Sequence, residues 1–301
     1  MILQKMFRTM DTQVFGEAYR IIVHSPFYFE GLDVQSNQQK VESHFEAEKN
    51  LLLNEPRGHR GMNGCIVGAS AAADYQLLFL HHQAAIDFKY EALLAATAAL
   101  LEIGHLQPRD NGQYTVETIH GVWQVKAAAR KQEVTAVTIE VAEGQTAESE
   151  SDASCVELPS GHRFYVHSLP ESITSLQLSQ LSEIMEWGAA QANALKSQQI
   201  AFDGIILKER IADASYRSVT FEKDGYILRS PGIESSIALA VGEEQSAESL
   251  SNESIFGSKI TIHSVPGKKG IFSVEGVPYV TGSHEFILDP EDPLPKGFVL
   301  A

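Results

Sequence analysis

A lysine at the expected start of a helix is the first candidate for chemistry in this chain. The segment from about Lys89 to Gly104 carries leucines at helical spacing with alanines between them, which predicts a helix. Gly104 can cap its end, and Pro108 stops it from continuing. The N-terminus of a helix offers unpaired N–H groups and a positive dipole, so it favours a carboxylate. Lys89 opposes that dipole, and a desolvated lysine amine could act as a base.

A second stretch, from Arg229 to Glu244, repeats this layout. A strand ends, a Ser-Pro-Gly turn follows, and a short helix of small residues begins near Ile233. Glu234 lies in its first turn, where a carboxylate is favoured. Two units of strand, turn and helix predict two similar halves, each presenting a helix N-terminus. Three hydroxyl groups lie near the start of the second helix, on Ser230, Ser235 and Ser236. They could bind a carboxylate or cap the helix.

Other elements must position these two helix starts. Tyr75 to Leu80 predicts a buried strand, and we expect the following His81 and His82 to continue it with side chains on opposite faces, a poor metal pair. Ser36 to Asn54 predicts one surface helix, and Leu176 to Lys196 a second amphipathic helix. Two acidic, serine-rich stretches predict mobile loops, at Glu143 to Asp152 and at Glu243 to Glu253.

Composition excludes several classes of partner. The chain has 301 residues, 44% hydrophobic and 21% charged, as expected for a globular protein. Its net charge of -16 argues against nucleic acid and membrane surfaces as partners. We find no signal peptide and no apolar run near the roughly 20 residues of a membrane helix. Two cysteines, Cys65 and Cys155, make neither a disulfide framework nor a zinc site, so we expect a cytoplasmic protein.

Neither a metal nor a nucleotide is expected. The glycine-rich stretch Asn54 to Ser70 lacks the pattern of a phosphate loop. Near the end of the chain is a DPEDP sequence with the acidic residues Asp289, Glu291 and Asp292. Its prolines favour a turn over a metal site.

Four segments along the chain resemble the proline racemase family, which includes hydroxyproline epimerases and trans-3-hydroxyproline dehydratases. Asp11 to Arg20 (DTQVFGEAYR) resembles the family's D-x-H-T-G-G-E-P-x-R, and Glu55 to Gly64 (EPRGHRGMNG) resembles E-P-R-G-H-x-D-M-Y-G. Asn252 to Ser258 (NESIFGS) resembles H-x-S-I-I-G-S, and Val280 to Leu300 resembles the family's C-terminal T-G-x-H-x-F-x-L-D-P-x-D-P-L-x-x-G-F-x-L. Together these motifs span nearly the whole chain.

The resemblance implies an α/β fold of two halves similar to diaminopimelate epimerase, each a curved sheet around a central helix, with the active site in the cleft between them. We expect the first half at 1–118 and about 282–301, with its central helix at about 89–104. The second half is then 119–281, with its helix at about 233–243. The resemblance further implies a cofactor-independent protein whose partner is a small carboxylate or amino acid of the proline or hydroxyproline type. The resemblance is equally compatible with a homodimer and with a monomer.

The two catalytic motifs of the family do not carry over. Racemases place a cysteine in M-C-G-H at the first helix, where this chain has Phe88-Lys89-Tyr90-Glu91, so Lys89 replaces the cysteine and Glu91 the histidine. The second motif, D-R-S-P-C-G-T-G-T, aligns with 228–236, so Gly232 replaces the second cysteine and Leu228 an aspartate that binds the amine. The alignment gives the candidate ligand-binding residues Tyr90, Leu228, Ser230, Ile233, Glu234, Ser235 and Ser236, to which the histidine of EPRGH adds His59.

Three hypotheses are compatible with these replacements. Racemisation needs a base on one face of the α-carbon and an acid on the other, and Gly232 has no side chain to supply either. The first hypothesis is a non-catalytic member that binds a ligand or only assembles. The second is an altered isomerase or lyase in which Lys89 is the base and Glu91 its partner, although the two could simply form a surface ion pair. The third is an epimerase that takes its acid and base from His81, His82 or Glu234.

Overall fold

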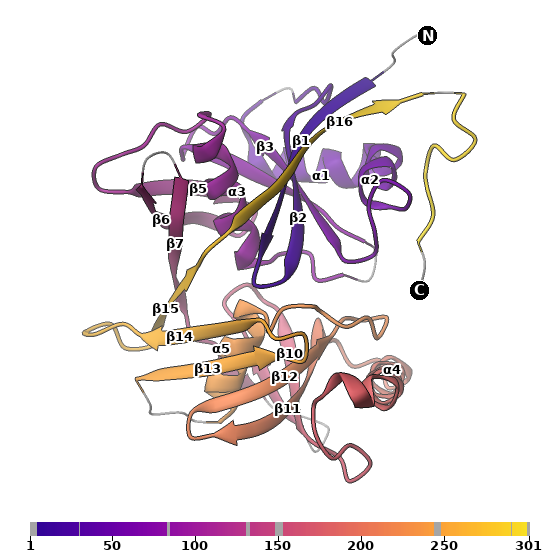
Figure 1. The fold of residues 1–301 in the computed structure, drawn as a ribbon, viewed down its shortest axis with the longest axis vertical. Coiled ribbons are helices and arrows are strands. Elements are labelled where there is room, and N and C mark those ends of the chain that lie inside the picture. Colours follow the sequence, from indigo (N-terminus) through magenta and orange to yellow (C-terminus); the bar gives the residue numbers. More distant parts are fainter. Residues whose placement is uncertain are drawn as a thin grey trace. The chain divides into compact units, whose positions relative to one another are not determined.

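Two units with the same order of strands and helices make up the chain (Figure 1). The computed structural model describes residues 5–29, 31–82, 85–130, 133–147, 153–243, 248–289 and 291–299. The first unit comprises Met1–Gln83, Glu91–Thr138 and Val277–Ala301, and the second comprises Ala84–Tyr90 and Ile139–Gly276.

The first unit has the strand order β16-β1-β2-β3-β4-β5-β6-β7, and the last strand continues past Thr138 into the second unit. Two helices connect β2 to β3, and a third connects β4 to β5. These elements are β1 (Lys5–Val14), β2 (Glu17–His24), α1 (Val34–His44), α2 (Glu46–Leu53), β3 (Met62–Gly68), β4 (Tyr75–Leu80), α3 (Tyr90–Glu102), β5 (Gln113–Thr118), β6 (Gly121–Arg130), β7 (Glu133–Ala142) and β16 (Tyr279–Leu288).

The second unit repeats this order as β8-β9-β10-β11-β12-β13-β14-β15. In both units two parallel pairs flank an antiparallel pair: β2/β3 and β4/β5 around β3/β4, and β10/β11 and β12/β13 around β11/β12. The predicted two similar α/β halves are therefore confirmed. The elements are β8 (Gln145–Ala147), β9 (Ser154–Glu157), β10 (Arg163–Ser168), η1 (Leu178–Gln180), α4 (Leu181–Ser197), β11 (Gly204–Ala212), β12 (Ser215–Phe221), α5 (Ile233–Gly242), β13 (Ser249–Ser254), β14 (Lys259–Ser264) and β15 (Ile271–Gly276).

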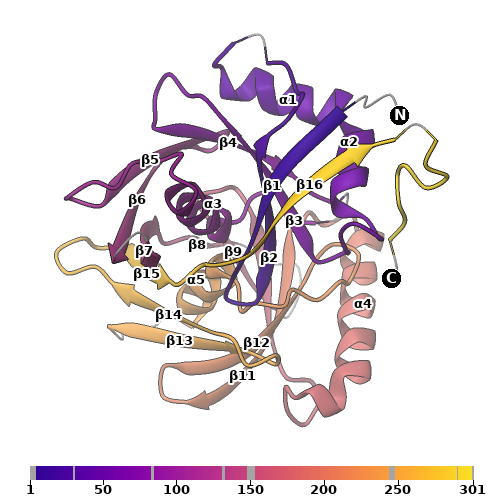
Figure 2. The same cartoon turned by 45° about the horizontal axis from the view of Figure 1, so that its top comes forward.

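Helix α3 is the buried axis of the first unit. Figure 2 views α3 nearly end-on, with strands of its unit curving around it. Leucines and alanines on every side of the helix are buried, which is the pattern of a helix inside a core. Strand β4 is buried on both faces, because Tyr75 contacts α3 through Thr97 (Oη–Oγ1, 2.8 Å) while Leu78 packs in a cluster with α1 and α2. This explains why β4 reads as one continuous apolar run.

Gly104 ends α3 in the way that its sequence predicts. Its φ is 75°, its N–H donates to Leu101 O (3.1 Å), and the N–H of His105 donates to Leu100 O (2.9 Å). These two bonds are those of a Schellman cap.

Gly104→Ala will lower the free energy of unfolding by about 1–2 kcal/mol, because a left-handed conformation is unfavourable for a residue with a Cβ. A Cβ added at Gly104 meets no atom within 4 Å, so steric overlap contributes nothing. Urea unfolding followed by circular dichroism measures the loss. Gly31→Ala is the matched control: its Cβ would also meet nothing, its φ is not positive, and it should not destabilise the protein. Equal stability of the two variants would contradict the prediction.

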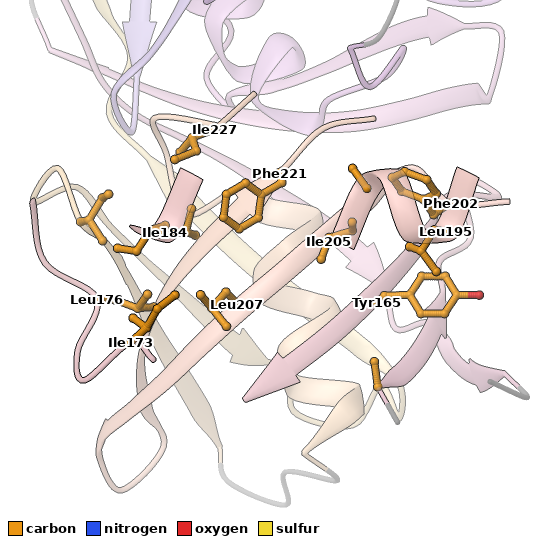
Figure 3. Close-up of a cluster of buried hydrophobic side chains, with 14 of the residues drawn as sticks. Tyr165, Ile173, Leu176, Ile184, Leu195, Phe202, Ile205, Leu207, Phe221 and Ile227 are labelled. Carbon is orange, nitrogen blue, oxygen red and sulfur yellow. The ribbon is translucent and has the colours of Figure 1, made fainter. Parts of the chain in front are cut away.

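In the second unit the two helices pack on opposite faces of the strands. Helix α4 covers β11 and β12 through a cluster that includes Ile184, Leu195 and Phe221, all labelled in Figure 3. Helix α5 contacts β8, β9, β10, β13 and β14. Like α3, α5 is buried along most of its length, from Ile233 to Ala240.

Several expected elements differ from the structure. The single helix expected over 36–54 is two helices separated by Phe45, whose φ of -113° is not helical and whose ring stacks on Phe27 (4.0 Å between centroids). His81 and His82 were wrongly predicted to lie on a strand, because β4 ends at Leu80. The first predicted acidic loop contains β8, and the second overlaps β13. Residues 148–152 and 244–247 of those loops lie outside the described residues. None of the helices that the structure describes is long and apolar enough to span a bilayer.

Candidate functional site

A buried histidine bridges two carboxylates at the start of α5. His162 Nδ1 lies 2.9 Å from Glu234 Oε2, and His162 Nε2 lies 2.7 Å from Asp87 Oδ1. The hydroxyl of Ser160 donates to the other oxygen of Glu234 (2.6 Å). Because both ring nitrogens face carboxylates, the ring is held as an imidazolium ion that donates to both.

The pKa of His162 reflects this position. Burial alone would lower it, but attraction to Glu234 and hydrogen bonds with Asp87 and Glu234 raise the pKa to about 10. The side chains of His162 and Glu234 are 7% and 6% exposed, whereas that of Asp87 is 54% exposed. The imidazolium of His162 therefore neutralises the buried carboxylate of Glu234 and also pairs with the half-exposed carboxylate of Asp87.

Lys89 forms a second buried ion pair in the same unit. Its Nζ lies 3.4 Å from Glu222 Oε1, and the two side chains are 10% and 1% exposed. The same carboxylate oxygen accepts a hydrogen bond from the N–H of Ile86 (3.2 Å). The surface location suggested for a pair of Lys89 and Glu91 is wrong, since both residues are buried, and the ammonium of Lys89 lies beside Glu222.

The segment 85–90, which leads into α3 and belongs to the second unit, is thus held by two sets of charges. Asp87 pairs with His162, which lies in the turn before β10. Lys89 pairs with Glu222, the residue after β12. Phe88 and Tyr90 are buried beside them, with their rings edge to face at 4.8 Å. We name these five charged residues the paired-charge cluster: Asp87, Lys89, His162, Glu222 and Glu234.

Gly232 is the residue before α5, and its backbone conformation requires glycine. Its φ of 74° and ψ of 130° lie where residues with a side chain are rarely found. Its N–H donates to Ser230 Oγ (3.0 Å), and its carbonyl accepts from Ser236 Oγ (2.7 Å). Ser235 Oγ accepts from the hydroxyl of Thr220 (2.8 Å). The three serines are thus hydrogen-bonded within their own unit, but none of these bonds caps an N–H of the first turn of α5, so capping by their side chains stays a prediction.

The remaining candidate residues divide between the units. Leu228 and Ile233 are buried in the second unit, next to the turn that carries Gly232. Glu91 belongs to the first unit and is buried in the first turn of α3. His59 also belongs to the first unit, in the loop between α2 and β3, where its carbonyl accepts from the N–H of Met62 (2.8 Å). That a site lies between the two halves stays a prediction from the resemblance.

Neither cysteine lies at the start of a helix. Cys65 is in the middle of β3, and burial raises the pKa of its thiol. Cys155 lies on β9 in the cluster that faces α4, and burial raises its pKa as well. Both thiols are poor nucleophiles in these surroundings.

The motifs that resemble the family hold the first unit together. Arg20 makes two hydrogen bonds to the carboxylate of Asp11 (2.9 and 2.7 Å) and donates to the carbonyls of Leu52 and Arg57. Arg57 in turn pairs with Asp292 of the DPEDP sequence (3.0 Å). The first, second and last motifs therefore meet in one network, which is buried at Asp11 and Arg20 and half-buried at Arg57 and Asp292. Among the described residues, no group of histidine, cysteine, aspartate or glutamate side chains could hold a metal ion.

Asp87, His162 and Glu222 were not singled out from the sequence. Their local signals are weak, since each lies in a short connection between elements. These residues form ion pairs with residues far away in the sequence. The periodicity of helices and strands does not predict such pairs.

The repeated α/β unit, with a buried helix in each half, defines an epimerase-type fold. Two solved structures share it at a TM-score of 0.80. One is a probable proline racemase from Agrobacterium radiobacter with bound carbonate, 18% identical, with 98% of this chain and 96% of that chain covered. The other is a hydroxyproline epimerase from Agrobacterium vitis with bound trans-4-hydroxy-L-proline, 20% identical, with 100% and 96% covered.

The sequence comparisons identify the family. The family model described as proline racemase matches residues 9–299. A trans-3-hydroxy-L-proline dehydratase from Bacillus cereus is 26% identical over 333 residues, and a proline racemase from Acetoanaerobium sticklandii is 23% identical over 340 residues. Both alignments cover 100% of each chain. The chain belongs to the proline racemase family.

Proposed function

We propose that this member of the proline racemase family binds a small carboxylic acid of the proline or hydroxyproline type and does not racemise it with paired thiols. One observation carries the proposal: residues 89 and 232, at which the motif comparison expects the family's cysteines, are a lysine paired with Glu222 and a glycine in a conformation that favours glycine. The relatives support the ligand class, because the two solved structures hold carbonate and trans-4-hydroxy-L-proline. The dipole of α5 favours a carboxylate at its N-terminus.

The Gly232 turn argues further against a thiol at that position. A Cβ there would lie 3.0 Å from Ser235 Oγ, and the φ of 74° is unfavourable for cysteine. We therefore expect that the double variant Lys89→Cys, Gly232→Cys gains no racemase activity, because the backbone cannot present the second thiol without rearranging. Chiral chromatography of L-proline incubated with the variant tests this, and D-proline formed above the level of the parent protein would contradict it.

The burial of Lys89 and Glu91 favours a second candidate function, an altered isomerase or lyase. The two residues are 8% and 3% exposed, and Lys89 would be the base and Glu91 its partner acid. An elimination needs only one base, so a lyase acting on an amino or hydroxy acid requires no group at Gly232. The ion pair with Glu222 opposes this role, since a nearby carboxylate stabilises the ammonium form of lysine.

Proton exchange separates the two candidates. The protein is incubated in heavy water with proline, hydroxyprolines and a panel of amino and hydroxy acids, and the α-proton is followed by NMR. Calorimetry on the same compounds measures binding. Our proposal expects binding of at least one carboxylic acid without loss of its α-proton signal. Exchange that disappears in Lys89→Met would instead support the altered enzyme, and absence of binding by every compound would overturn the proposal.

A further inference from the structure

A hollow of about 750 Å³ lies within the first unit, and the described residues that line it all belong to that unit. One wall comes from β1, β2 and β16, which lie side by side (Figure 1), and the other comes from Ile103 and His105, just after α3. This volume is typical of small-molecule sites, which span roughly 300–1,000 Å³. The candidate residue Glu91 lies near the other end of α3, about 18 Å along the helix axis, so the hollow is a separate place on the unit.

Basic side chains outnumber acidic ones in the lining that the structure describes. The basic residues are Arg8, His24, His105 and His284, and the acidic residue is Glu285. The chain as a whole has a net charge of -16, so this hollow differs in sign from the average surface. A concave surface lined by basic groups attracts anions.

The register of the strands places Arg8 at the centre of this lining. Arg8 lies opposite His24 on β2 and opposite Glu285 on β16, so the three side chains share one face of the sheet. The guanidinium of Arg8 pairs with Glu285 (Nη2–Oε1, 2.8 Å), but the two side chains are 58% and 53% exposed. An ion pair this exposed is weak, so an anion can take the place of Glu285 on Arg8 at little cost.

Two exposed histidines add hydrogen-bond donors on either side of Arg8. His24 ends β2, and His105 follows the glycine cap of α3. A neutral imidazole offers one N–H and an imidazolium two, so either form can donate to an acid group. His284 differs from them, because its Nε2 lies 3.4 Å from Asp11 Oδ2 and a positive charge on its ring is offset within the protein.

The remaining lining is largely apolar. Met6 and Met10 lie two residues before and after Arg8 on β1, and Val23 and Ile103 lie across from them. Methionine side chains are flexible and polarisable, and they pack well against aromatic rings. The hollow therefore offers an apolar surface beside its basic groups.

We propose that this hollow binds an organic anion with an apolar body. Arg8, His24 and His105 hold the acid group, and Arg8 exchanges its pair with Glu285 for the pair with the ligand. The ring or short alkyl chain of the ligand packs on the methionines. This site is additional to the function proposed above and does not depend on it.

Phenyl phosphate and phenol form a matched pair of probes, since they share a ring and differ in the acid group. Calorimetry with the full chain should show phenyl phosphate binding about ten-fold more tightly than phenol, or better, because a charged hydrogen bond to arginine is strong. Binding of neither compound, or equal binding of both, would overturn the inference. Neither result would bear on the carboxylic acids of the proposed function.

Variants of the exposed ion pair should change the affinity for phenyl phosphate in opposite directions. Arg8→Gln removes the cation and leaves Glu285 to repel the anion, so the affinity should fall about ten-fold. Glu285→Gln removes the competing carboxylate, so the affinity should rise about three-fold. Both side chains are exposed, so neither change threatens folding.

A second exposed ion pair supplies the matched controls. Arg210 and Asp213 of the second unit are paired (2.6 Å), and their side chains are 57% and 99% exposed. Arg210→Gln and Asp213→Asn change the net charge by the same amounts as the test variants and should leave the affinity unchanged. Equal effects of Arg8→Gln and Arg210→Gln would show a response to net charge alone. That result, or an affinity unchanged in Arg8→Gln, would overturn the inference.

Discussion

Replacing Lys89 by methionine will lower the free energy of unfolding by about 3–5 kcal/mol, because it leaves Glu222 charged and 1% exposed with its ammonium partner gone. Removing one partner of a buried pair costs far more than the pair itself contributes. The expected loss is therefore a consequence of burial, and it does not require that Lys89 take part in any reaction.

The measurement can be confined to the second unit. The chain has two tryptophans, and Trp187 on α4 packs against Phe221 while Trp123 lies on β6 of the first unit. In a Trp123→Phe background, urea unfolding followed by fluorescence reports on the surroundings of Trp187. The control Lys196→Met should change stability by less than about 0.5 kcal/mol, as exposed substitutions do.

A double variant distinguishes charge from packing. Lys89→Met combined with Glu222→Met removes both charges, and an apolar pair of similar volume can replace a buried ion pair at little cost. We expect the double variant to regain most of the lost stability. If Lys89→Met instead unfolds like the parent but loses an α-proton exchange activity, the lysine serves chemistry, and the altered isomerase or lyase becomes the better assignment.

Local patterns in the sequence were enough to place the helices and strands that matter most. The apolar run of β4, the leucine and alanine pattern of α3 and the positive-φ glycine that ends it follow from interactions within a few residues. The repeat of strand, turn and helix before α5 likewise predicted the second half. Where distant side chains decide the outcome, as at Phe45, the local pattern predicted one helix where the structure has two.

The paired-charge cluster could not be predicted for a related reason. His162 and Glu234 are 72 positions apart, and His162 and Asp87 are 75 apart. Asp87 and His162 look like ordinary polar residues in turns, and although Glu234 was a candidate, nothing near it in the sequence indicates its partner. Only the fold brings the carboxylates to both nitrogens of one ring, and this changes a neutral histidine into a buried cation.

Stability of the second unit should fall as pH rises from about 6.5 to 10, and His162 is the cause. Its pKa is about 10 in the folded protein and near 6.5 in an unfolded chain, so folding favours the protonated ring. The stability that the ring contributes is complete below pH 6.5 and is lost as pH approaches 10. A shift of this size corresponds to a loss on the order of 3–5 kcal/mol across that window.

The variant His162→Gln separates this effect from other groups that titrate at alkaline pH. Glutamine keeps hydrogen-bonding capacity but cannot be charged, and tyrosines, lysines and cysteines titrate in both proteins. Glu234 from α5 and Asp87 from the segment 85–90 face the ring, and Ser160 from the turn before β10 acts on it through Glu234. The difference in unfolding free energy between parent and variant should therefore be largest near pH 6 and should shrink steadily toward pH 10. A difference that does not change with pH, or an NMR titration of the His162 ring near pH 6.5, would show that the ring is not held as a cation by Glu234 and Asp87.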